Sequence, residues 1–264
     1  MERKNTFNEI AREYDKYRPD YPEQLFTDIL EYSSLNPYDK ILEIGCGTGQ
    51  ATKGFVQSGY CHITGIELGE HLADLTREKF KDIPTVKIIH SPFETWQNEG
   101  TSFHLAISGT AFHFIQPQDY GYRKVFDLLG SQGSIAFFWT VHVPSYDNLS
   151  NQIRDIYRRC APQLDDSTNP SMQQIIEERS NAILKEGLYK DLEVKQYRWD
   201  DPYSAREYVS LLNTNSRHRL LPEDIRSRLL GEIGEAIEKK GGTIHKPQAV
   251  VLFLAKKNGA KKDD

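Results

Sequence analysis

Three glycines at alternating positions are the residues of this chain best suited to hold a ligand. Gly45, Gly47 and Gly49 directly follow the apolar run at 41–44. Glycine tolerates positive φ and has no Cβ, so such a loop turns tightly and brings its backbone close to a bound molecule. A glycine-rich loop behind a buried strand is typical of nucleotide-type cofactor sites. The nicotinamide fingerprint also needs glycine at the sixth place of the run, where this chain has Gln50, so the pattern disfavours a dinucleotide.

A carboxylate at the end of the next predicted strand supports the same interpretation. Glu67 closes the β-type run at 62–67 and is followed by a helical pattern at 70–81. In βαβ cofactor sites an acidic residue roughly 20 positions beyond the glycines accepts hydrogen bonds from ribose hydroxyls. The alternative is that Glu67 only begins the helix, because carboxylates favour helix N-termini.

The glycine-rich loop and its flanking acid resemble motif I of a known family. The spacing G-x-G-x-G, with Glu43 two residues before the first glycine, is similar to that of the class I methyltransferases. This resemblance implies S-adenosylmethionine as cofactor and S-adenosylhomocysteine as product. A third strand is predicted at 86–89, and the resemblance implies that the loop after this strand flanks the adenine ring. Phe93 lies in that loop and takes this role by resemblance. The alternative is that Phe93 is an ordinary core residue.

The first forty residues carry a second, independent pattern. Residues 7–22 spell F-x-x-x-A-x-x-Y-D-x-Y-R-P-x-Y-P. This pattern resembles the N-terminal cap of the trans-aconitate methyltransferase-like branch, a segment that folds over the cofactor. The resemblance implies that Tyr14 and Arg18 lie near the methionyl end of the cofactor, and it makes Tyr17 a substrate candidate. The alternative is a tyrosine-rich arm that packs on the surface, since tyrosine is amphipathic.

The residues expected to contact the cofactor stand at the ends of predicted strands or in the N-terminal segment. They are Tyr14, Arg18, Glu43, Gly45, Cys46, Gly47, Gly49, Gln50, Glu67, Leu68, Pro92, Phe93, Glu94, Ser108, Gly109 and Thr110. The last three follow or close a fourth predicted strand, at 103–108. They are candidates because open parallel sheets bind ligands beyond the carboxyl ends of their strands.

The loop after the fourth strand contains one titratable side chain, His113. An unperturbed histidine has a pKa of about 6.5, which suits a general base or a hydrogen-bonding orienter. The alternative is a structural histidine. The loop lacks the Asn/Asp-Pro-Pro-Tyr and Pro-Cys sequences of enzymes that methylate nucleobases and instead resembles the small-molecule branch. Base methylation is therefore disfavoured.

The second half of the chain completes the predicted sheet and adds a helical insertion. Strands are predicted at 134–139, 192–199 and 249–255. Helical stripes over 149–160 and 172–184 predict a lid above the acceptor site, which would exclude water and shape that site. The alternative is a packing appendage.

A polar patch follows the sixth strand and a further helix. Ser204 and Glu207 are spaced as a capping box that begins this helix. The residues at 213–218 come after it and are all polar. The resemblance makes Thr214 and Ser216 acceptor-binding candidates, whereas their polarity favours a solvated loop.

These elements together predict an α/β fold. By the resemblance it is a Rossmann-like, mainly parallel sheet of seven strands in the order 3-2-1-4-5-7-6, with strand 7 antiparallel and helices on both faces. A single methyltransferase domain is expected over 1–264. Its parts are an N-terminal cap and helix at 1–36, a cofactor-binding core at 37–142, the helical lid insertion at 143–190, the remainder of the core at 191–257 and a flexible tail at 258–264.

The composition and charge of the chain disfavour several classes of binding partner. A net charge of -5 over 264 residues argues against an extended phosphate-binding surface, so nucleic acid is not expected as a substrate. The three cysteines lack C-x-x-C spacing and the histidines form no metal motif, so neither a disulfide framework nor a metal site is predicted. No apolar run reaches the roughly 18 residues of a membrane span, and no signal region is recognisable. We expect a cytoplasmic protein, whose oligomeric state the sequence leaves open.

The predicted function is transfer of a methyl group from S-adenosylmethionine to a small-molecule acceptor by in-line displacement. O-methylation or carboxyl methylation is favoured. The alternatives are a non-catalytic cofactor-binding protein, an oxidoreductase of the NAD type, and a methyltransferase acting on RNA or protein.

Overall fold

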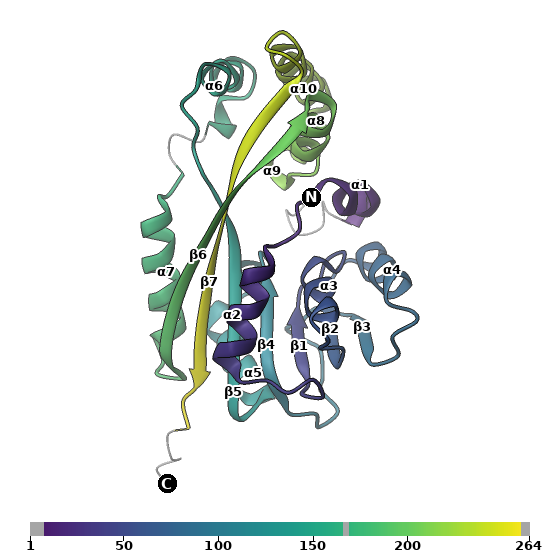
Figure 1. The fold of residues 1–264 in the computed structure, drawn as a ribbon, viewed down its shortest axis with the longest axis vertical. Coiled ribbons are helices and arrows are strands. Elements are labelled where there is room, and N and C mark those ends of the chain that lie inside the picture. Colours follow the sequence, from purple (N-terminus) through teal and green to yellow (C-terminus); the bar gives the residue numbers. More distant parts are fainter. Residues whose placement is uncertain (1–7, 166–168, 260–264) are drawn as a thin grey trace. The chain divides into compact units, whose positions relative to one another are not determined.

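The computed structural model describes residues 8–165 and 169–259, which form a seven-stranded sheet flanked by helices (Figure 1). The strand order β3-β2-β1-β4-β5-β7-β6 is the predicted one, and β7 runs antiparallel to its neighbour β5. The strands are β1 (Ile41–Ile44), β2 (Ile63–Glu67), β3 (Val86–His90), β4 (Phe103–Gly109), β5 (Leu129–His142), β6 (Tyr189–Ser204) and β7 (Thr243–Lys257). The predicted fold class is therefore confirmed.

The helices alternate with the first strands and cluster in the second half of the chain. They are α1 (Ala11–Tyr17), α2 (Glu23–Ser33), α3 (Gln50–Gln57), α4 (Glu70–Lys79), α5 (Gln118–Leu128), α6 (Asn148–Cys160), α7 (Met172–Leu184), α8 (Ala205–Asn213), α9 (Ser216–Arg219) and α10 (Glu223–Glu238). Within the described ranges, 3-10 turns lie at Asn8–Ile10, Phe112–Phe114 and Pro162–Leu164.

The chain divides into two compact units. The sheet unit comprises Asp20–Thr140, Met172–Tyr197 and Val250–Asp264, and the helical unit comprises Met1–Pro19, Val141–Ser171 and Arg198–Ala249. The segment expected as one lid insertion, at 143–190, is split between them, because α6 belongs to the helical unit and α7 to the sheet unit. In the sheet unit, Arg179 of α7 stacks on Trp139 of β5, with its guanidinium carbon 3.9 Å from the ring centroid. This helix thus contacts the sheet of its own unit, and the lid role of the segment at 143–190 stays a prediction.

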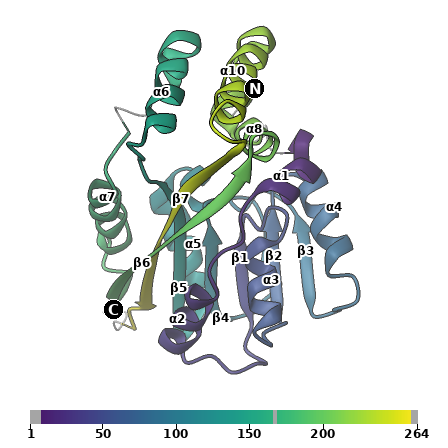
Figure 2. The same ribbon diagram turned by 45° about the horizontal axis from the view of Figure 1, so that its top comes forward.

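The sheet unit is organised by buried strands. All four residues of β1 are buried, and β1 pairs in parallel with β2 and β4, with Ile41 opposite both Ile63 and Leu105. A strand buried on both faces needs apolar residues at every position and helices on either side. Figure 2 shows α2 and α3 together in front of this part of the sheet. Their close approach depends on Gly54, since a Cβ there would lie 2.0 Å from the Phe26 ring.

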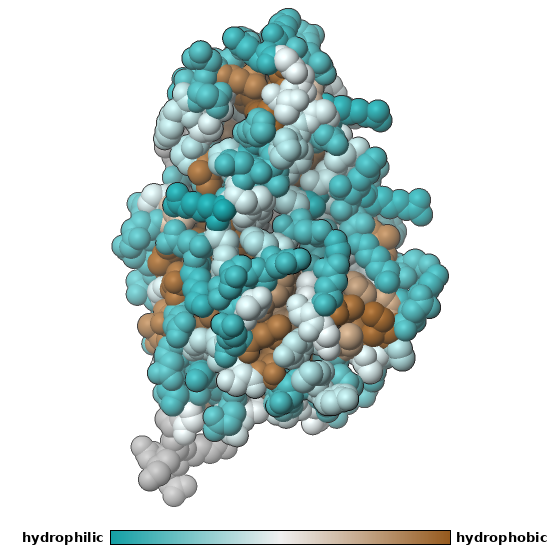
Figure 3. Space-filling view, in the orientation of Figure 1, coloured by the Kyte–Doolittle hydropathy of each residue, from teal (hydrophilic) through white to brown (hydrophobic). Residues whose placement is uncertain are grey.

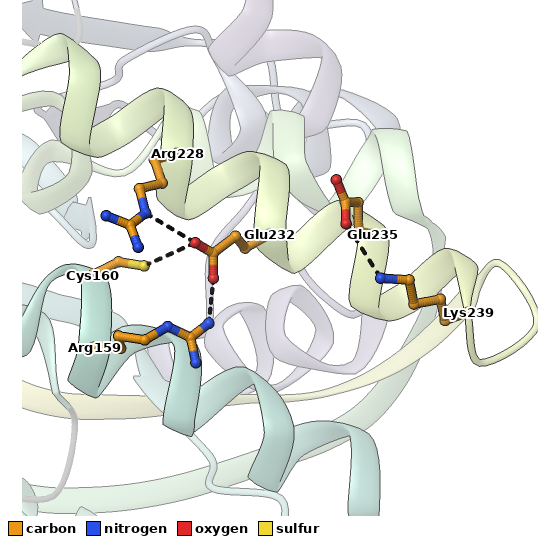
Figure 4. A network of polar contacts seen from close by, with 6 residues as sticks. All are labelled: Arg159, Cys160, Arg228, Glu232, Glu235 and Lys239. Atoms are coloured by element: carbon orange, nitrogen blue, oxygen red, sulfur yellow. Dashed lines mark hydrogen bonds and ion pairs between the residues drawn. The ribbon is translucent and has the colours of Figure 1, made fainter.

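The helical unit has a core of its own, in which α10 packs against α6 and α8. The capping box predicted at Ser204 and Glu207 is present at the start of α8. On the surface, Glu232 of α10 accepts hydrogen bonds from Arg159, Arg228 and the Cys160 thiol, which ties α10 to α6 (Figure 4). The hydrogen bonds from the two arginines lower the pKa of Glu232 to about 2.

Two further features, in a loop and at a strand end, differ from the predictions, and some residues named in the predictions lie outside the described ranges. The polar patch at 213–218 is not a solvated loop, because it contains α9 and buries Thr214, Ser216 and His218. Strand β7 continues to Lys257, two residues beyond the predicted end. The first aromatic residue of the N-terminal pattern, Phe7, and the end of the expected tail lie outside the described residues.

The face seen in Figure 3 is mainly hydrophilic, with small scattered apolar areas. Within the part of the chain that the structure describes, no helix combines the length and the apolar character needed to cross a membrane.

Candidate functional site

The carboxyl ends of four parallel strands bring the predicted cofactor loops to one edge of the sheet unit. Strand β1 lies between β2 and β4, and β3 pairs with β2. Backbone hydrogen bonds join the loops at this edge, from Gly45 N to Ile66 O at 2.8 Å and from Ser91 N to Glu67 O at 2.9 Å. The predicted residues at 43–50, 67–68, 92–94 and 108–113 therefore come together in space.

The glycine-rich loop has positive φ at all three glycines, and the first two play different parts. Gly45 has φ +70°, and a Cβ there would lie 2.4 Å from the Cβ of Ala111, so this position allows β1 to pass close to the loop after β4. Gly47 has φ +57°, and nothing lies within 4 Å of a Cβ built on it. The open space of the loop is thus at Gly47, which is where a ligand can approach the backbone.

The carboxylate of Glu67 lies directly against this loop. Its Oε2 accepts a hydrogen bond from Gly47 N at 2.8 Å, and its Oε1 accepts one from Gly69 N at 2.7 Å. Burial raises the pKa of Glu67, and the backbone N–H groups of Gly69 and Gly47 oppose that shift. Helix α4 begins at Glu70 with Gly69 as its N-cap, so Glu67 precedes the helix rather than starting it. Because a carboxylate offers about four acceptor positions, two bonds leave capacity for a ligand's hydroxyls.

Glu43 lies inside the fold below the loop. It is 2 % exposed, and its Oε2 accepts a hydrogen bond from the Thr52 hydroxyl at 2.5 Å. Burial raises the pKa of Glu43 to about 8, and the charge of Glu67 adds to that shift. Its side chain therefore supports the loop from within, which revises its expected role as a direct cofactor contact.

The burial of Glu43 predicts a pH-dependent stability. Since the folded-state pKa lies near 8 and the unfolded one near 4.5, the native state holds the proton more tightly across this window. The stabilisation that the bound proton of Glu43 adds to the free energy of unfolding is fully present below pH 4.5. It is lost as the pH rises through 8. We expect the free energy of unfolding of Glu43→Gln, measured with urea from pH 5 to pH 8.5, to fall less steeply with pH than that of the wild type.

The control for this experiment is Glu31→Gln, because Glu31 is an exposed residue of α2. Its unfolding free energy should follow the wild-type slope. If Glu43→Gln also kept that slope, the proton assigned to Glu43 would belong to another group.

Two side chains that no sequence pattern singles out hold the loop in place. The hydroxyl of Thr76 donates to Gly47 O at 2.8 Å, and the ammonium of Lys79 donates to Thr48 O at 2.6 Å. Both residues lie on α4, 29 and 31 positions away from the groups they bind. A helical pattern indicates which face of α4 is buried but not which carbonyl its polar residues reach.

Three other predicted cofactor residues use their side chains within the protein. The Cys46 side chain packs with Ala73 and Ile88. The Ser108 hydroxyl is fully buried and donates to Ile44 O at 2.7 Å, which joins the ends of β4 and β1. The Phe93 ring is 3 % exposed and lies under the ammonium of Lys124, so it has a core environment. Only the backbone of these residues remains available to a cofactor.

The remaining predicted loop residues are more open. Gln50 is half-buried and hydrogen-bonded to the Thr48 hydroxyl. Leu68 is half-buried, Pro92 is exposed, and Glu94 accepts from the backbone N–H of Gln116 at 3.3 Å. These four residues, Gln50, Leu68, Pro92 and Glu94, retain partly accessible side chains around the loop edge.

The end of β4 is held by contacts with β5. Thr110 has φ +55°, and its hydroxyl accepts a hydrogen bond from Thr140 N at 3.2 Å. At Gly109 a Cβ would lie 2.7 Å from the Phe138 ring and 2.9 Å from the Tyr21 hydroxyl. A side chain larger than hydrogen at Gly109 would therefore push these rings apart.

His113 lies in the 3-10 turn after β4, and its orientation is set by a tryptophan. The indole Nε1 of Trp139 donates to His113 Nδ1 at 3.2 Å. Because an indole N–H can only donate, Nδ1 must be the acceptor, and the proton of the neutral imidazole lies on Nε2. The tryptophan is 26 residues away on β5, and no sequence pattern pointed to it.

The five predicted residues of the N-terminal segment and the polar patch lie in the helical unit. Arg18 donates from Nε to Thr214 Oγ1 and from Nη2 to Thr214 O, both at 3.2 Å, and its guanidinium lies over the Tyr14 ring. A hydrogen bond with Ser210 lowers the pKa of Tyr17. Tyr14, Arg18 and Thr214 are thus brought together, Tyr17 contacts α8, and Ser216 is buried at the start of α9.

No group of three or more side chains suited to hold a metal ion occurs in the regions 8–165 and 169–259. The loop is nevertheless suited to an organic cofactor. The open space beside Gly47 and the adjoining Glu67 carboxylate fit a ligand that carries vicinal hydroxyls.

Comparisons with known proteins agree with this geometry. Residues 41–133 match the model of a methyltransferase domain. An uncharacterised methyltransferase of Schizosaccharomyces pombe is 22 % identical over 233 residues, which are 88 % of this chain and 87 % of that protein.

Two solved structures share the fold. A provisionally assigned type II methyltransferase of Anaeromyxobacter dehalogenans superposes with a TM-score of 0.60 at 19 % identity and covers 91 % of this chain and 97 % of its own. Phosphoethanolamine N-methyltransferase 2 of Haemonchus contortus, in complex with phosphomonomethylethanolamine and S-adenosylhomocysteine, superposes with a TM-score of 0.55 at 13 % identity. That alignment covers 95 % of this chain and 57 % of the Haemonchus protein.

The sheet order, the glycine-rich loop and these matches define a class of protein, the class I methyltransferases. The match to the methyltransferase domain model spans residues 41–133, which contain the loop and the carboxylate.

Proposed function

We propose that this protein transfers a methyl group from S-adenosylmethionine to a small-molecule acceptor and releases S-adenosylhomocysteine. The observation that carries the proposal is the pairing of the open backbone at Gly47 with the Glu67 carboxylate, 2.8 Å apart. The trans-aconitate methyltransferase-like branch and a cytoplasmic location stay predictions from the sequence.

The chain's own residues would bind and align the cofactor. Bound S-adenosylmethionine supplies a sulfonium-activated methyl group that needs no covalent enzyme intermediate. Glu67 would accept the ribose hydroxyls, and the backbone at 45–50 would lie along the amino-acid portion. Leu68, Pro92 and Glu94 would line the adenine side. Alignment of this kind can contribute roughly 7–11 kcal/mol to the barrier reduction, so the protein has no need of a dedicated nucleophile.

An oxygen or carboxyl acceptor fits the loop after β4 better than a nucleobase. The loop lacks the sequences that base methyltransferases carry at this place. A carboxylate acceptor is already deprotonated at neutral pH and needs no base. An alcohol, phenol or amine acceptor would gain from proton removal.

His113 would act as an orienter rather than as a general base. Its Nδ1 lone pair is engaged by Trp139, so the ring could take up a proton there only by losing that hydrogen bond. Its Nε2 carries the proton of the neutral form and suits donation to an oxygen acceptor.

This assignment predicts a modest effect of His113→Gln. Loss of one orienting hydrogen bond should lower kcat/KM about tenfold, whereas loss of a general base should cost about 100-fold or more. The measurement is kcat/KM between pH 5.5 and pH 8.5 with an acceptor that supports turnover. Trp139→Phe is the companion variant and should show a similar loss, because it removes the bond that holds the ring. A rate that is unchanged in His113→Gln would exclude both roles.

The proposal is tested by isothermal titration of the full chain with S-adenosylmethionine, S-adenosylhomocysteine and NADH. Micromolar binding of the first two, followed by transfer of labelled methyl to members of a panel of carboxylic acids, phenols and amines, would support it. Binding of NADH alone would favour an oxidoreductase.

A non-catalytic binding protein and a macromolecular methyltransferase would each give a distinct outcome in the same experiment. Cofactor binding with no transfer to any panel member, nor to RNA or protein substrates, would favour the binding protein. Transfer only to RNA or protein would favour the macromolecular enzyme.

A further inference from the structure

A turn after β3 and one face of α5 are joined by contacts that no sequence pattern indicated. The turn comprises residues 92–96 and includes Pro92 and Glu94, which are expected on the adenine side of the cofactor site. The face of α5 carries Tyr120 and Lys124, which are four positions apart and therefore neighbours on the helix surface. All of these residues belong to the sheet unit.

Lys124 binds the backbone of this turn. Its ammonium donates to three carbonyl oxygens, those of Phe93 at 2.7 Å, Glu94 at 3.1 Å and Trp96 at 2.5 Å. Because an ammonium has three N–H groups, each of them can be matched by one carbonyl. The ammonium also lies 5.1 Å from the centroid of the Phe93 ring and 6.0 Å from that of the Trp96 ring, which adds cation–π attraction. The donors of Lys124 are thus used by the turn.

The hydrogen bonds inside the turn explain why its carbonyls need a partner. Pro92 O accepts from Thr95 N at 3.3 Å and from Trp96 N at 3.0 Å. The carbonyls held by Lys124 receive no backbone N–H from the described residues, and a buried carbonyl without a donor is costly. Lys124 supplies the missing donors, and the Tyr120 hydroxyl supplies one more to the Glu94 carbonyl at 3.0 Å. The conformation of the turn therefore depends on α5.

Other polar groups of the turn remain open to a ligand. Within residues 8–165 and 169–259, neither Phe93 N nor Glu94 N donates to a protein acceptor. The Glu94 carboxylate accepts from Gln116 N through Oε1 at 3.3 Å, which leaves acceptor capacity on its other oxygen. Adenine carries ring-nitrogen acceptors and an exocyclic amine that donates, so it matches backbone N–H donors next to a carboxylate.

A second lysine of the sheet unit makes a similar contact away from the cofactor loops. Lys257 donates to Leu129 O at 2.7 Å, and its ammonium lies 4.3 Å from the centroid of the Phe126 ring. Leu129 is the first residue of β5, which runs parallel to β4, so this contact lies at the amino ends of strands whose carboxyl ends carry the candidate site. Burial lowers the pKa of both Lys124 and Lys257. The two lysines have comparable surroundings, but only Lys124 adjoins the site.

We propose that Lys124 is a positioning residue of the cofactor site, whose ammonium holds the turn at 92–96 in the conformation that binds adenine. The inference rests on the proposed function for the identity of the ligand. Lys124 acts through the three carbonyls and leaves contact with the base to the turn itself. Its loss should therefore loosen the turn in the free protein and weaken every ligand that carries adenine.

The test compares Lys124→Met with the matched control Lys257→Met by isothermal titration of the full chain. The ligands are S-adenosylhomocysteine and methylthioadenosine, which keeps the adenine and ribose but lacks the amino-acid portion. We expect Lys124→Met to weaken both ligands at least tenfold and by similar factors, and Lys257→Met to keep both within about twofold of the wild type. Tyr120→Phe removes one hydrogen bond made by an exposed side chain and should weaken both about threefold. It decides the outcome if Lys124→Met does not fold.

A measurement on the free protein separates positioning from a general loss of stability. The amide of Trp96, which donates to Pro92 O, should exchange its hydrogen at least tenfold faster in Lys124→Met than in the wild type, while the amides of β4 keep their rates. Lys124→Arg keeps the charge, but a planar guanidinium cannot direct its N–H groups at three converging carbonyls. It should therefore bind both ligands more tightly than Lys124→Met and more weakly than the wild type.

The outcomes distinguish this inference from the proposed function. Wild-type affinity in a folded Lys124→Met, an equal loss in Lys257→Met, or unchanged exchange at Trp96 would overturn the positioning role. A loss confined to S-adenosylhomocysteine would also overturn it, because the lysine would then act on the amino-acid portion. If the wild type binds both ligands and the variants do not differ from it, the inference alone fails. If the wild type binds neither ligand, the proposed function fails and the inference fails with it.

Discussion

Replacement of Glu67 by glutamine should weaken S-adenosylmethionine binding about 100-fold. Two hydrogen bonds to a charged acceptor contribute about 1.5–3 kcal/mol each, and the substitution removes the charge and one of the two acceptor oxygens. The remaining amide group also sets an N–H against a backbone N–H, either that of Gly47 or that of Gly69, because both carboxylate oxygens now accept such bonds. The measurement is the Kd from isothermal titration, with the thermal midpoint recorded for each variant.

Glu70→Gln is the matched control for this prediction. Glu70 is an exposed residue in the first turn of α4, three positions beyond Glu67. It should leave the Kd unchanged within twofold. If Glu67→Gln kept wild-type affinity while remaining folded, the ribose assignment of this carboxylate would be wrong, and the second strand would have only a structural acid at its end.

Gly45 and Gly47, the first two of the three glycines of the loop, should respond in different ways to the same small change. Gly47→Ala adds a methyl group to open space, so the folded state bears only the strain of a positive φ, about 1 kcal/mol, while the methyl obstructs the cofactor. Gly45→Ala places the same methyl group 2.4 Å from the Cβ of Ala111 and should destabilise the fold by several kcal/mol.

Both variants are examined by urea unfolding and by titration with S-adenosylhomocysteine. We expect Gly47→Ala to unfold near the wild-type midpoint and to lose at least tenfold in affinity, and Gly45→Ala to unfold at much lower urea. Gly59→Ala serves as a reference, because Gly59 also has a positive φ and open surroundings but lies in the turn after α3. A Gly47→Ala variant with unchanged affinity would place the ligand elsewhere.

Much of the fold was predictable because the relevant forces are local or periodic. The buried run at 41–44 and the glycines behind it require a strand and a turn whatever follows. The capping box at Ser204 depends on two residues three positions apart. The seven-stranded order came from the resemblance of the loop to a family, since strand order depends on pairings that no local pattern encodes.

The details of the site were harder to predict because they depend on distant partners. The side chain of Ser108 was expected to face a ligand, yet its hydroxyl is used by Ile44, 64 positions earlier. Thr214 and Ser216 were acceptor-binding candidates by the resemblance, and their polarity favoured a solvated loop, but Thr214 is held by Arg18 across 196 residues. Trp139 carried no recognisable signal as a partner of His113, since an aromatic residue in an apolar strand is ordinary.

The same limit applies to the helical insertion. Two helical stripes in succession indicated one lid insertion, whereas α7 packs through Arg179 on a tryptophan of β5. Sequence periodicity identifies the apolar face of a helix, but the partner of that face is a property of the whole chain.

The division into two units also constrains how this protein can be taken apart or diversified. The backbone passes between the units at five places, after residues 19, 140, 171, 197 and 249. No single cut yields either unit as one continuous polypeptide, so the helical unit cannot be exchanged between relatives as a cassette. A chimaera that takes the helical unit from a relative must therefore combine three separate segments, 1–19, 141–171 and 198–249, in one gene.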